Sequence, residues 1–342
     1  MIPTLVLITA VVFAVVKIAP GNPFSFAQST GEGAVRQMNP ADYQALLVRY
    51  GLDRPWYVQY WKWLKSAATG SFGDSFSERR PVVDVMFSGA FSAFTEGLGP
   101  VKASSEFVRR LASSRFGATI FLNGLSLLLM LLVAIPAGFL AASKRGGWFD
   151  RISSFLLYGL YSLPNFWLAV LLIILFGVKL KLLPFLGMHS DGYRSLSAGA
   201  ALVDALEHAV LPGLCLAAGG LAFMARFARG SLLEVLNQDY IRTAKAKGLG
   251  EGAILRRHAA PNALVPLLTL LGLLLPALIS GSVIIEQIFA WPGLGQMTIQ
   301  AITARDYPVI MAVAVMGAVA VLVSNLLTDV AYHLADPRVR LE

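Results

Sequence analysis

Residues 230–262 read GSLLEVLNQDYIRTAKAKGLGEGAILRRHAAPN, and this charged island stands between two long apolar segments. Amphipathic turns, a central Gly248 and a closing Pro261 predict two short helices joined by a bend. The cations of the island outnumber its acids, which are Glu234, Asp239 and Glu251; the cations are Arg242, Lys245, Lys247, Arg256 and Arg257. A structured basic loop between apolar spans indicates a docking site for a component outside the membrane.

The composition indicates an integral membrane protein. Of the 342 residues, 56% are hydrophobic and only 14% are charged. Soluble domains carry about 25% charged residues. The net charge of +8 does not indicate nucleic-acid binding, because many of the cations flank apolar spans. The positive-inside rule places cations at such positions.

The reactive residue types argue against chemistry within this chain. The lone cysteine, Cys215, lies in an apolar run and excludes an intrachain disulfide. The histidines at positions 189, 208, 258 and 333 lack metal-ligand spacing, so we expect no metal site built from this chain alone. Phosphate-loop, zinc-protease and hydrolase-elbow motifs are also missing from the sequence. Any nucleotide that this protein uses must therefore bind to another polypeptide.

Six apolar segments come close to or exceed the roughly 20 residues that cross a bilayer as a helix. They lie near residues 2–19, 119–142, 152–178, 209–227, 264–290 and 309–331. The first is interpreted as a retained span, because it has no basic start and Pro20 to Pro23 follow it directly. The chain begins almost inside this segment, so we expect its true start to lie upstream. The sequence thus predicts an all-α polytopic membrane protein with six transmembrane helices.

The cations of the short loops predict the orientation. Lys144, Arg145 and Arg151 follow the second span, seven Lys and Arg lie between positions 226 and 257, and Arg338 and Arg340 lie in the tail. All three groups fall on one side, which the positive-inside rule assigns to the cytoplasm. Both termini are then cytoplasmic, and residues 20–117 form a long extracytoplasmic segment between the first two spans.

The extracytoplasmic segment contains an aromatic stretch and a weakly patterned stretch. Residues 46–64 are rich in Trp and Tyr, which prefer the lipid headgroup zone, so an interfacial helix is expected after Pro55. Residues 70–76 are typical of a turn. Residues 81–115 fit a small extracellular cap or a partner-binding surface, and the pattern does not decide between them.

Prolines and sparse polar residues inside the spans indicate bent helices around a passage, although many polytopic folds have such bends. The prolines are Pro136, Pro164, Pro212 and Pro276. The polar residues serve equally well as a lining or in helix packing; they are Asn123, Ser126, Ser162, Asn165, Ser280 and Ser282. Glu286 lies near the expected outer interface, where water reaches it, and has either a structural hydrogen bond or a role in the passage. Asp329 is expected to pair locally or to cap a turn.

The island resembles the EAA loop of ABC importer permeases in the spacing of Arg242-Thr243-Ala244, Gly248 and Pro261. Further blocks look like the dipeptide/oligopeptide permease family and occur in its order over nearly the whole chain. They lie at residues 18–23, 51–60, 70–76, 162–167, 238–249, 291–295, 305–308 and 336–338.

Some positions depart from the family pattern. Arg242 stands where the EAA motif has Glu, a variation common in the peptide branch, and His258 and Ala260 replace its usual Ile and Leu. Residues 87–113 look like an insertion, onto which no function is carried.

The resemblance implies a type I ABC importer permease fold in a bacterial cytoplasmic (inner) membrane. Residues 1–19 would form the first helix, 20–117 the extracytoplasmic segment and 118–342 the permease core. The implied partners are a second homologous permease, two cytoplasmic ATPases that hold ATP and Mg, and an extracytoplasmic substrate-binding protein. Contacts to the ATPase would involve Arg242, Thr243, Ala244, Lys245, Lys247, Gly248, Leu249 and Pro261.

The resemblance also implies a function, the uptake of di- and oligopeptides by alternating access, driven by ATP hydrolysis on the partner ATPases. The polar residues that would line the translocation path are Ser162, Asn165, Ser280, Ser282 and Glu286. Related permeases share the same blocks, so nickel or an oligosaccharide is an alternative cargo. A passive channel and a membrane-embedded enzyme are rival classes. The channel would leave the island without a purpose, and the enzyme would need clustered acids or histidines near an interface.

Overall fold

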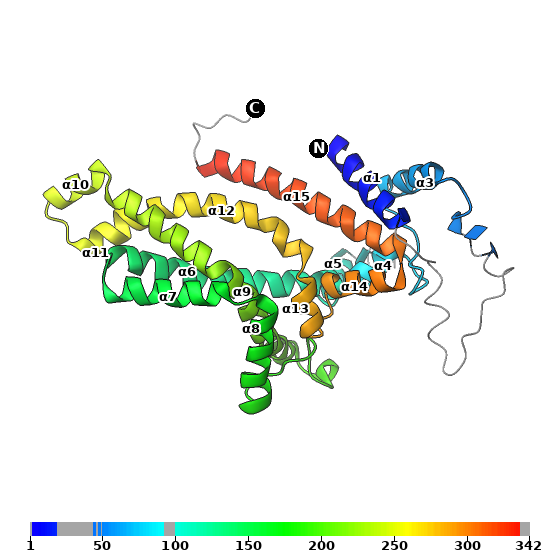
Figure 1. Cartoon of the computed structure of the whole chain (residues 1–342), viewed down its shortest axis with the longest axis horizontal. Coiled ribbons are helices and arrows are strands. Elements are labelled where there is room, and N and C mark those ends of the chain that lie inside the picture. Colours follow the sequence, from blue (N-terminus) through cyan, green and yellow to red (C-terminus); the bar gives the residue numbers. More distant parts are fainter. Residues whose placement is uncertain (1, 19–43, 46, 49, 92–99, 336–342) are drawn as a thin grey trace. The chain divides into compact units, whose positions relative to one another are not determined.

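The computed structural model describes residues 2–18, 44–45, 47–48, 50–91 and 100–335 of the chain (Figure 1). Most of these residues are helical, and the described part contains one isolated β-bridge, between Asp74 and Pro81, and no strand. The contacts divide the chain into two compact units. Unit 1 comprises residues 1–119, 279–283 and 292–322, and unit 2 comprises residues 120–278, 284–291 and 323–342.

Among the described residues, four helices are long and apolar enough to cross a membrane. They are Arg115–Ser143, Gly199–Leu236, Glu251–Ile279 and Tyr307–Leu327. A fifth span results if the bent pair Trp148–Ser162 and Asn165–Lys179 is counted as one. α1 (Ile2–Ile18), in the first predicted span, is apolar but has only 17 residues. The all-α prediction is confirmed, and the sixth span stays a prediction.

Unit 2 is built on α6 (Arg115–Ser143), α7 (Trp148–Ser162), α9 (Ala198–Leu236) and α12 (Ala260–Ser280), which extend along one another in Figure 1. Met130, Met224 and Leu267 are buried together where three of these helices meet. Small residues permit the close approach of α6 and α9. A Cβ atom on Gly138 of α6 would lie only 2.4 Å from the carbonyl oxygen of Ala225 on α9.

The predicted span at residues 152–178 is sharply bent at the proline that was expected to bend it. α7 ends at Ser162; α8 (Asn165–Leu172) and the π-helical η3 (Ile173–Lys179) that continues it run at an angle of 100° to α7. The break lies at Leu163-Pro164. Leu163 has the extended backbone (φ −80°, ψ 128°) that a following proline favours, because the proline ring clashes with a helical neighbour.

Two further predicted spans have different bounds in the structure. The helix expected near residues 209–227 begins at Ala198, where Ser197 accepts the N–H of Ala200, and continues to Leu236. The span expected to run from 264 to 290 stops at Ser280, and α13 (Val283–Ile288) is a separate helix. Gly281, between them, has a φ of +67°, which ends a right-handed helix.

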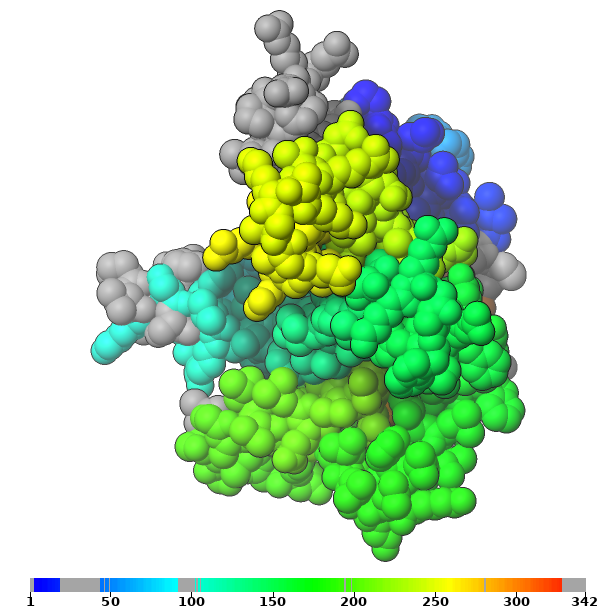
Figure 2. Space-filling view, turned by 90° about the vertical axis from the view of Figure 1, so that its left-hand side faces the viewer, coloured from blue at the N-terminus to red at the C-terminus, as the bar shows by residue number. Residues whose placement is uncertain are grey.

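The charged island forms one short helix and the beginning of a long one, and Figure 2 shows it in yellow at one end of unit 2. α10 (Asp239–Ala246) confirms the first predicted short helix. The second helix was predicted to stop at Pro261, and this prediction is wrong. α11 (Glu251–Ile254) continues through the π-helical η5 (Leu255–Ala259) into α12. The wide η5 turn directly before Pro261 leaves room for the ring, which would clash with a carbonyl in a regular helix.

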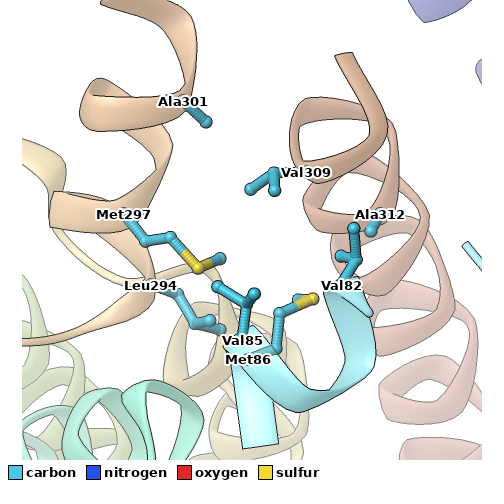
Figure 3. Packing of buried hydrophobic residues seen from close by; sticks show 8 residues of the cluster. All are labelled: Val82, Val85, Met86, Leu294, Met297, Ala301, Val309 and Ala312. Carbon is cyan, nitrogen blue, oxygen red and sulfur yellow. The ribbon is translucent and has the colours of Figure 1, made fainter. Parts of the chain in front are cut away.

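Unit 1 has its core between α4 (Val82–Phe87), α14 (Leu294–Ala304) and α15 (Tyr307–Ala335). Figure 3 shows Val85 and Met86 of α4 pointing toward Leu294 and Met297 of α14, with Val309 of α15 completing the cluster. The segment from residue 81 was predicted to be weakly patterned. In the structure, the beginning of this segment forms α4 and belongs to the hydrophobic core of unit 1.

A buried carboxylate joins distant parts of unit 1. Asp306 precedes α15, and its Oδ2 atom accepts hydrogen bonds from the Ser75 hydroxyl at 2.5 Å and from the Ser77 N–H at 3.1 Å. Nearby, Arg115 donates to Glu78 and to Gln300, each at 3.0 Å. These contacts attach the turn-rich segment before α4 to the connection between α14 and α15.

Besides α4, the helices α3 and α5 lie in the predicted extracytoplasmic segment. α3 (Trp56–Ala68) confirms a helix after Pro55, and its Tyr60 hydroxyl donates to the Val6 carbonyl of α1 at 3.0 Å. α5 (Pro100–Ala112) lies within the stretch interpreted as an insertion. The short 3-10 turn η4 (Tyr193–Ser195) lies in unit 2, ahead of α9. Two of the family-like blocks fall almost entirely outside the described residues, at 18–23 and 336–338. The tail cations Arg338 and Arg340 also fall outside them.

Candidate functional site

The turn between α10 and α11 has a defined hydrogen-bond geometry centred on Gly248. The Gly248 N–H donates to the Lys245 carbonyl at 2.9 Å, and the Leu249 N–H donates to the Ala244 carbonyl at 3.3 Å. This pair of bonds is the Schellman motif, in which the residue after the helix adopts a left-handed conformation. Gly248 has a φ of +80°, which glycine adopts without steric cost. The bend predicted at this glycine is therefore confirmed.

α10 is fixed to the ends of the long helices by an apolar contact. Ile241 is fully buried and Ala244 nearly so, against Leu232 of α9, Ile254 of α11 and Ala263 of α12. Burial of an isoleucine of this kind contributes roughly 1.5–3 kcal/mol. A buried hydrogen bond of 2.8 Å from the Ser231 hydroxyl to the Ala263 carbonyl joins α9 to α12 directly. α10 is thus packed against the ends of both long helices, which are joined to each other.

The opposite face of α10 is polar, basic and open. Arg242 has 75% of its side chain exposed and forms an ion pair of 3.4 Å with Asp239, which is 94% exposed. A pair this exposed contributes little to stability, so Arg242 remains available for other contacts. Thr243, Lys245 and Lys247 are exposed as well. Two apolar side chains, Tyr240 and Leu249, are more than a third exposed beside these cations.

Six of the eight predicted coupling residues therefore form one surface. Ala244 faces the core, and Pro261 is exposed in the first turn of α12. The other predicted residues are exposed along α10 and its capping turn; they are Arg242, Thr243, Lys245, Lys247, Gly248 and Leu249. Exposed cations beside exposed apolar groups are suited to contact a protein surface with an acidic rim.

The predicted path residues near Pro164 lie at the bend between α7 and α8. The Ser162 hydroxyl donates to the Tyr158 carbonyl at 2.8 Å, and Asn165 begins α8. The buried Cys215 of α9 donates its S–H to the Asn165 carbonyl at 3.1 Å. Ser162 and Asn165 are both exposed in the chain itself.

The remaining path candidates lie around the break between α12 and α13. Ser282 is half-buried in that break, and the side chains of Ser280 and Asp329 fall outside the described part. Glu286 is 0% exposed and takes part in an interaction within the chain. The expectation that water reaches Glu286 is therefore wrong for this structure. Asn123 donates to the Ala277 and Leu278 carbonyls at 3.3 and 3.0 Å, which favours helix packing for this residue.

An ion pair and a cavity in unit 2 were not predicted. Arg229 of α9 donates two parallel hydrogen bonds of 2.9 Å to the Asp150 carboxylate of α7, and the Gly146 N–H donates a third, also of 2.9 Å. Asp150 and Arg229 line a cavity of about 410 Å³. A lone acid among the cations at 144–151 is the sequence signal that marks this pair.

The described residues contain no group of three or more His, Cys, Asp or Glu side chains that could hold a metal ion. The arrangement at the island offers contact surface and mechanical connection, without a nucleophile, an acid–base pair or a phosphate-binding loop.

Comparison with known families identifies the class of the protein. Residues 134–341 match the family described as binding-protein-dependent transport system inner membrane component. This match covers more than half of the chain and includes the island, and the chain belongs to that family. It is a transport component, and separate ATPase subunits hydrolyse ATP in systems of this kind. The rival classes of passive channel and membrane-embedded enzyme are thereby set aside.

Curated relatives are similar over nearly their whole length. The oligopeptide transport system permease protein AppB of Bacillus subtilis is 36% identical over 338 residues, which cover 99% of this chain and 96% of AppB. The dipeptide transport system permease protein DppB of Alkalihalophilus pseudofirmus is 34% identical, with the same coverage of the two chains. The glutathione transport system permease protein GsiC of Escherichia coli K12 is also 34% identical at that coverage.

A solved structure supports the fold. A chain of the methionine ABC transporter MetNI, crystallised in an inward-facing conformation, aligns with a TM-score of 0.51 at 20% identity. The alignment covers 65% of this chain and 94% of the MetNI chain. This alignment supports the predicted permease fold of a type I ABC importer.

Proposed function

We propose that this chain is the membrane-spanning permease subunit of an ABC importer that takes up di- and oligopeptides. The names of the relatives support the cargo, because AppB, DppB and GsiC are permease proteins of oligopeptide, dipeptide and glutathione transport systems. All three cargoes contain peptide bonds, and none is a metal ion or an oligosaccharide.

The surface formed by α10 and its capping turn, from Asp239 to Leu249, docks on a cytoplasmic ATPase. One observation carries this assignment: α10 exposes Arg242, Lys245 and Lys247 outward while Ile241 anchors it to the ends of α9 and α12. Closure of the ATPases on ATP would displace α10, and the rigid contact would pass the displacement to the spans. An isolated polar loop without this anchor would absorb the movement.

The full transporter contains a second homologous permease, two ATPases that bind ATP and Mg, and an external binding protein. The chain lies in a bacterial cytoplasmic membrane with both termini inside. Residues 1–19 form the first of six spans, residues 20–117 lie outside, and residues 118–342 form the permease core. Within that core the path includes Ser162 and Asn165 at the α7–α8 bend and Ser280, Ser282 and Glu286 around the α12–α13 break.

Charge reversal on α10 tests the docking assignment in the assembled transporter. We expect Lys245→Glu/Lys247→Glu to lower ATP-dependent uptake of a labelled dipeptide about tenfold or more, because like charges at an interface cost several kcal/mol. The ATPases should also be lost from the purified complex. The matched control is Lys144→Glu/Arg145→Glu, which makes the same charge change at exposed positions in another loop. Normal uptake and full ATPase retention in the α10 variant would refute the assignment.

A further inference from the structure

The unpredicted cavity of about 410 Å³ lies between α6, α7 and α9 of unit 2. Its volume falls in the range of small-molecule sites, roughly 300–1,000 Å³. One face of α7 supplies much of the wall, through residues 150, 151, 153, 154, 157 and 158. The close crossing of α6 and α9 at Gly138 and Ala225 supplies the rest.

The charges in the wall do not balance within the cavity. Three arginines and one aspartate line it. The Asp150 carboxylate is already committed to Arg229 through two hydrogen bonds of 2.9 Å. Arg151 and Arg226 remain, and neither forms an ion pair with any residue that the structure describes. Two positive charges are therefore left for an anion from outside the chain.

Neutral hydrogen-bond donors accompany these cations. Ser153, Ser154 and Tyr158 line the same cavity with their hydroxyl-bearing side chains. Arginine and hydroxyl groups together are typical of sites that hold phosphate oxygens, because the guanidinium donates paired hydrogen bonds in a fixed plane. Asp150 would repel an anion if it were free, but its oxygens are occupied by Arg229 and by the Gly146 N–H.

The far face of α7 indicates where the anion comes from. Ile152, Phe155 and Leu156 are exposed there, and Phe155 has 76% of its surface uncovered. α7 also belongs to the bent pair that qualifies as one membrane span. Arg151 of the cavity wall lies one helical turn before Phe155, so a lipid whose acyl chains lie along this apolar face would have its headgroup beside Arg151.

We infer that this cavity binds the phosphate group of an anionic phospholipid, with Arg151 and Arg226 as the charged contacts. Basic pockets between membrane helices on the cytoplasmic side are suited to such headgroups. Arg229 directly precedes the charged island and lies seven residues, or about 10 Å along the helix, before the end of α9 at Leu236. The bound headgroup would therefore brace the base of the island. This inference does not depend on the cargo or on ATPase docking.

Native mass spectrometry of the full chain, purified in detergent, tests the site. The chain is titrated with phosphatidylglycerol and separately with phosphatidylcholine. Wild type is expected to retain phosphatidylglycerol, and Arg151→Gln/Arg226→Gln to retain it about tenfold less well. The control Lys144→Gln/Arg145→Gln removes the same charge outside the cavity wall and should retain the lipid within about twofold of wild type.

Other outcomes overturn the inference. Equal retention of phosphatidylcholine and phosphatidylglycerol by wild type would show annular lipid only, and equal loss in the control would show a general charge effect. A competition arm adds inorganic phosphate; displacement of the lipid at millimolar phosphate would assign the site to free phosphate. Arg226→Gln alone provides a second variant if the double variant does not insert, and unchanged retention by it would also count against the site.

Discussion

At the scale of single residues, Gly138 leaves α6 no room for a side chain. Its Cβ would meet the Ala225 carbonyl oxygen of α9 at 2.4 Å, and backbone cannot move aside as a flexible side chain can. We expect Gly138→Ala to lower the stability of the detergent-purified chain by about 1–3 kcal/mol, as other overpacked cores show. Thermal unfolding followed by circular dichroism measures this loss.

Gly124 provides the matched control in the same helix. Nothing lies within 4 Å of its added Cβ, so Gly124→Ala should raise stability by up to about 1 kcal/mol through helix propensity. Equal effects of the two substitutions would mean that the α6–α9 crossing is looser than the structure shows.

Gly248 differs from Gly138 because its constraint is the backbone angle alone. No atom lies within 4 Å of its Cβ position, but its φ is +80°. Gly248→Val should cost about 1–2 kcal/mol in the capping turn, and ATP-dependent uptake by the assembled transporter should fall with it. Gly248→Asn, which tolerates this conformation better, should retain most activity. Equal uptake by the Gly248→Val and Gly248→Asn variants would mean that the left-handed conformation at position 248 does not matter for transport.

At the scale of elements, α5 carries a salt bridge that responds to acid. Glu106 accepts hydrogen bonds from Arg109 at 2.7 Å and Arg110 at 2.7 Å, and these arginines lower the pKa of its carboxyl to about 2 from 4.5. A depressed pKa in the folded state means that the contribution is complete above pH 4.5 and is lost as the pH falls toward 2.

Hydrogen exchange of residues 100–112 measures this contribution. Wild type should protect α5 better than Glu106→Gln at pH 7, and the difference should shrink as the pH falls toward 2, because the Glu106 carboxyl becomes protonated over that range. A difference between wild type and Glu106→Gln that persisted unchanged at pH 2 would rule out the ion pair as its source.

The sequence predicted elements well where a local signal decides them, and less well where packing decides. The glycine-capped α10 and the helix after Pro55 follow from turn and capping residues. Pro164 was recognised as a break, but its 100° angle depends on what α8 packs against, and a sequence pattern does not contain that. The six-residue α4 is too short for a periodic signal, and only its partners in α14 and α15 identify it as core.

The candidate site shows the same division. The exposed cations of the island were predicted from charge alone, because the surface of a short amphipathic helix follows from its own residues. The Asp150–Arg229 pair joins positions 79 residues apart, so neither partner identifies the other in the chain. Glu286 was expected near water, but it is buried on α13, whose Ile285 and Phe289 pack in a cluster with Cys215 of α9.

At the scale of the whole molecule, the proposed topology places the charged island and α3 on opposite sides of the membrane. Lys247 and Lys65 are both exposed, and the lone native thiol, Cys215, is fully buried. A membrane-impermeant maleimide added to intact cells should therefore label Lys65→Cys several-fold more than Lys247→Cys. Permeabilised cells, in which both positions should react, provide the control. Labelling of Lys247→Cys from outside would reverse the topology.

The hydrogen bonds of Asp306 have a consequence for biosynthesis. Its partner Ser75 lies 231 residues earlier in the chain, and the buried partners of α4 come from α14 and α15. The ribosome must therefore complete most of the polypeptide before the early segment can reach its final packing, and until then Val82, Val85 and Met86 lack the part of their cover that these two helices provide. During that interval the nascent chain depends on the insertion machinery to shield it, and messages truncated before codon 306 would yield products destined for proteolysis.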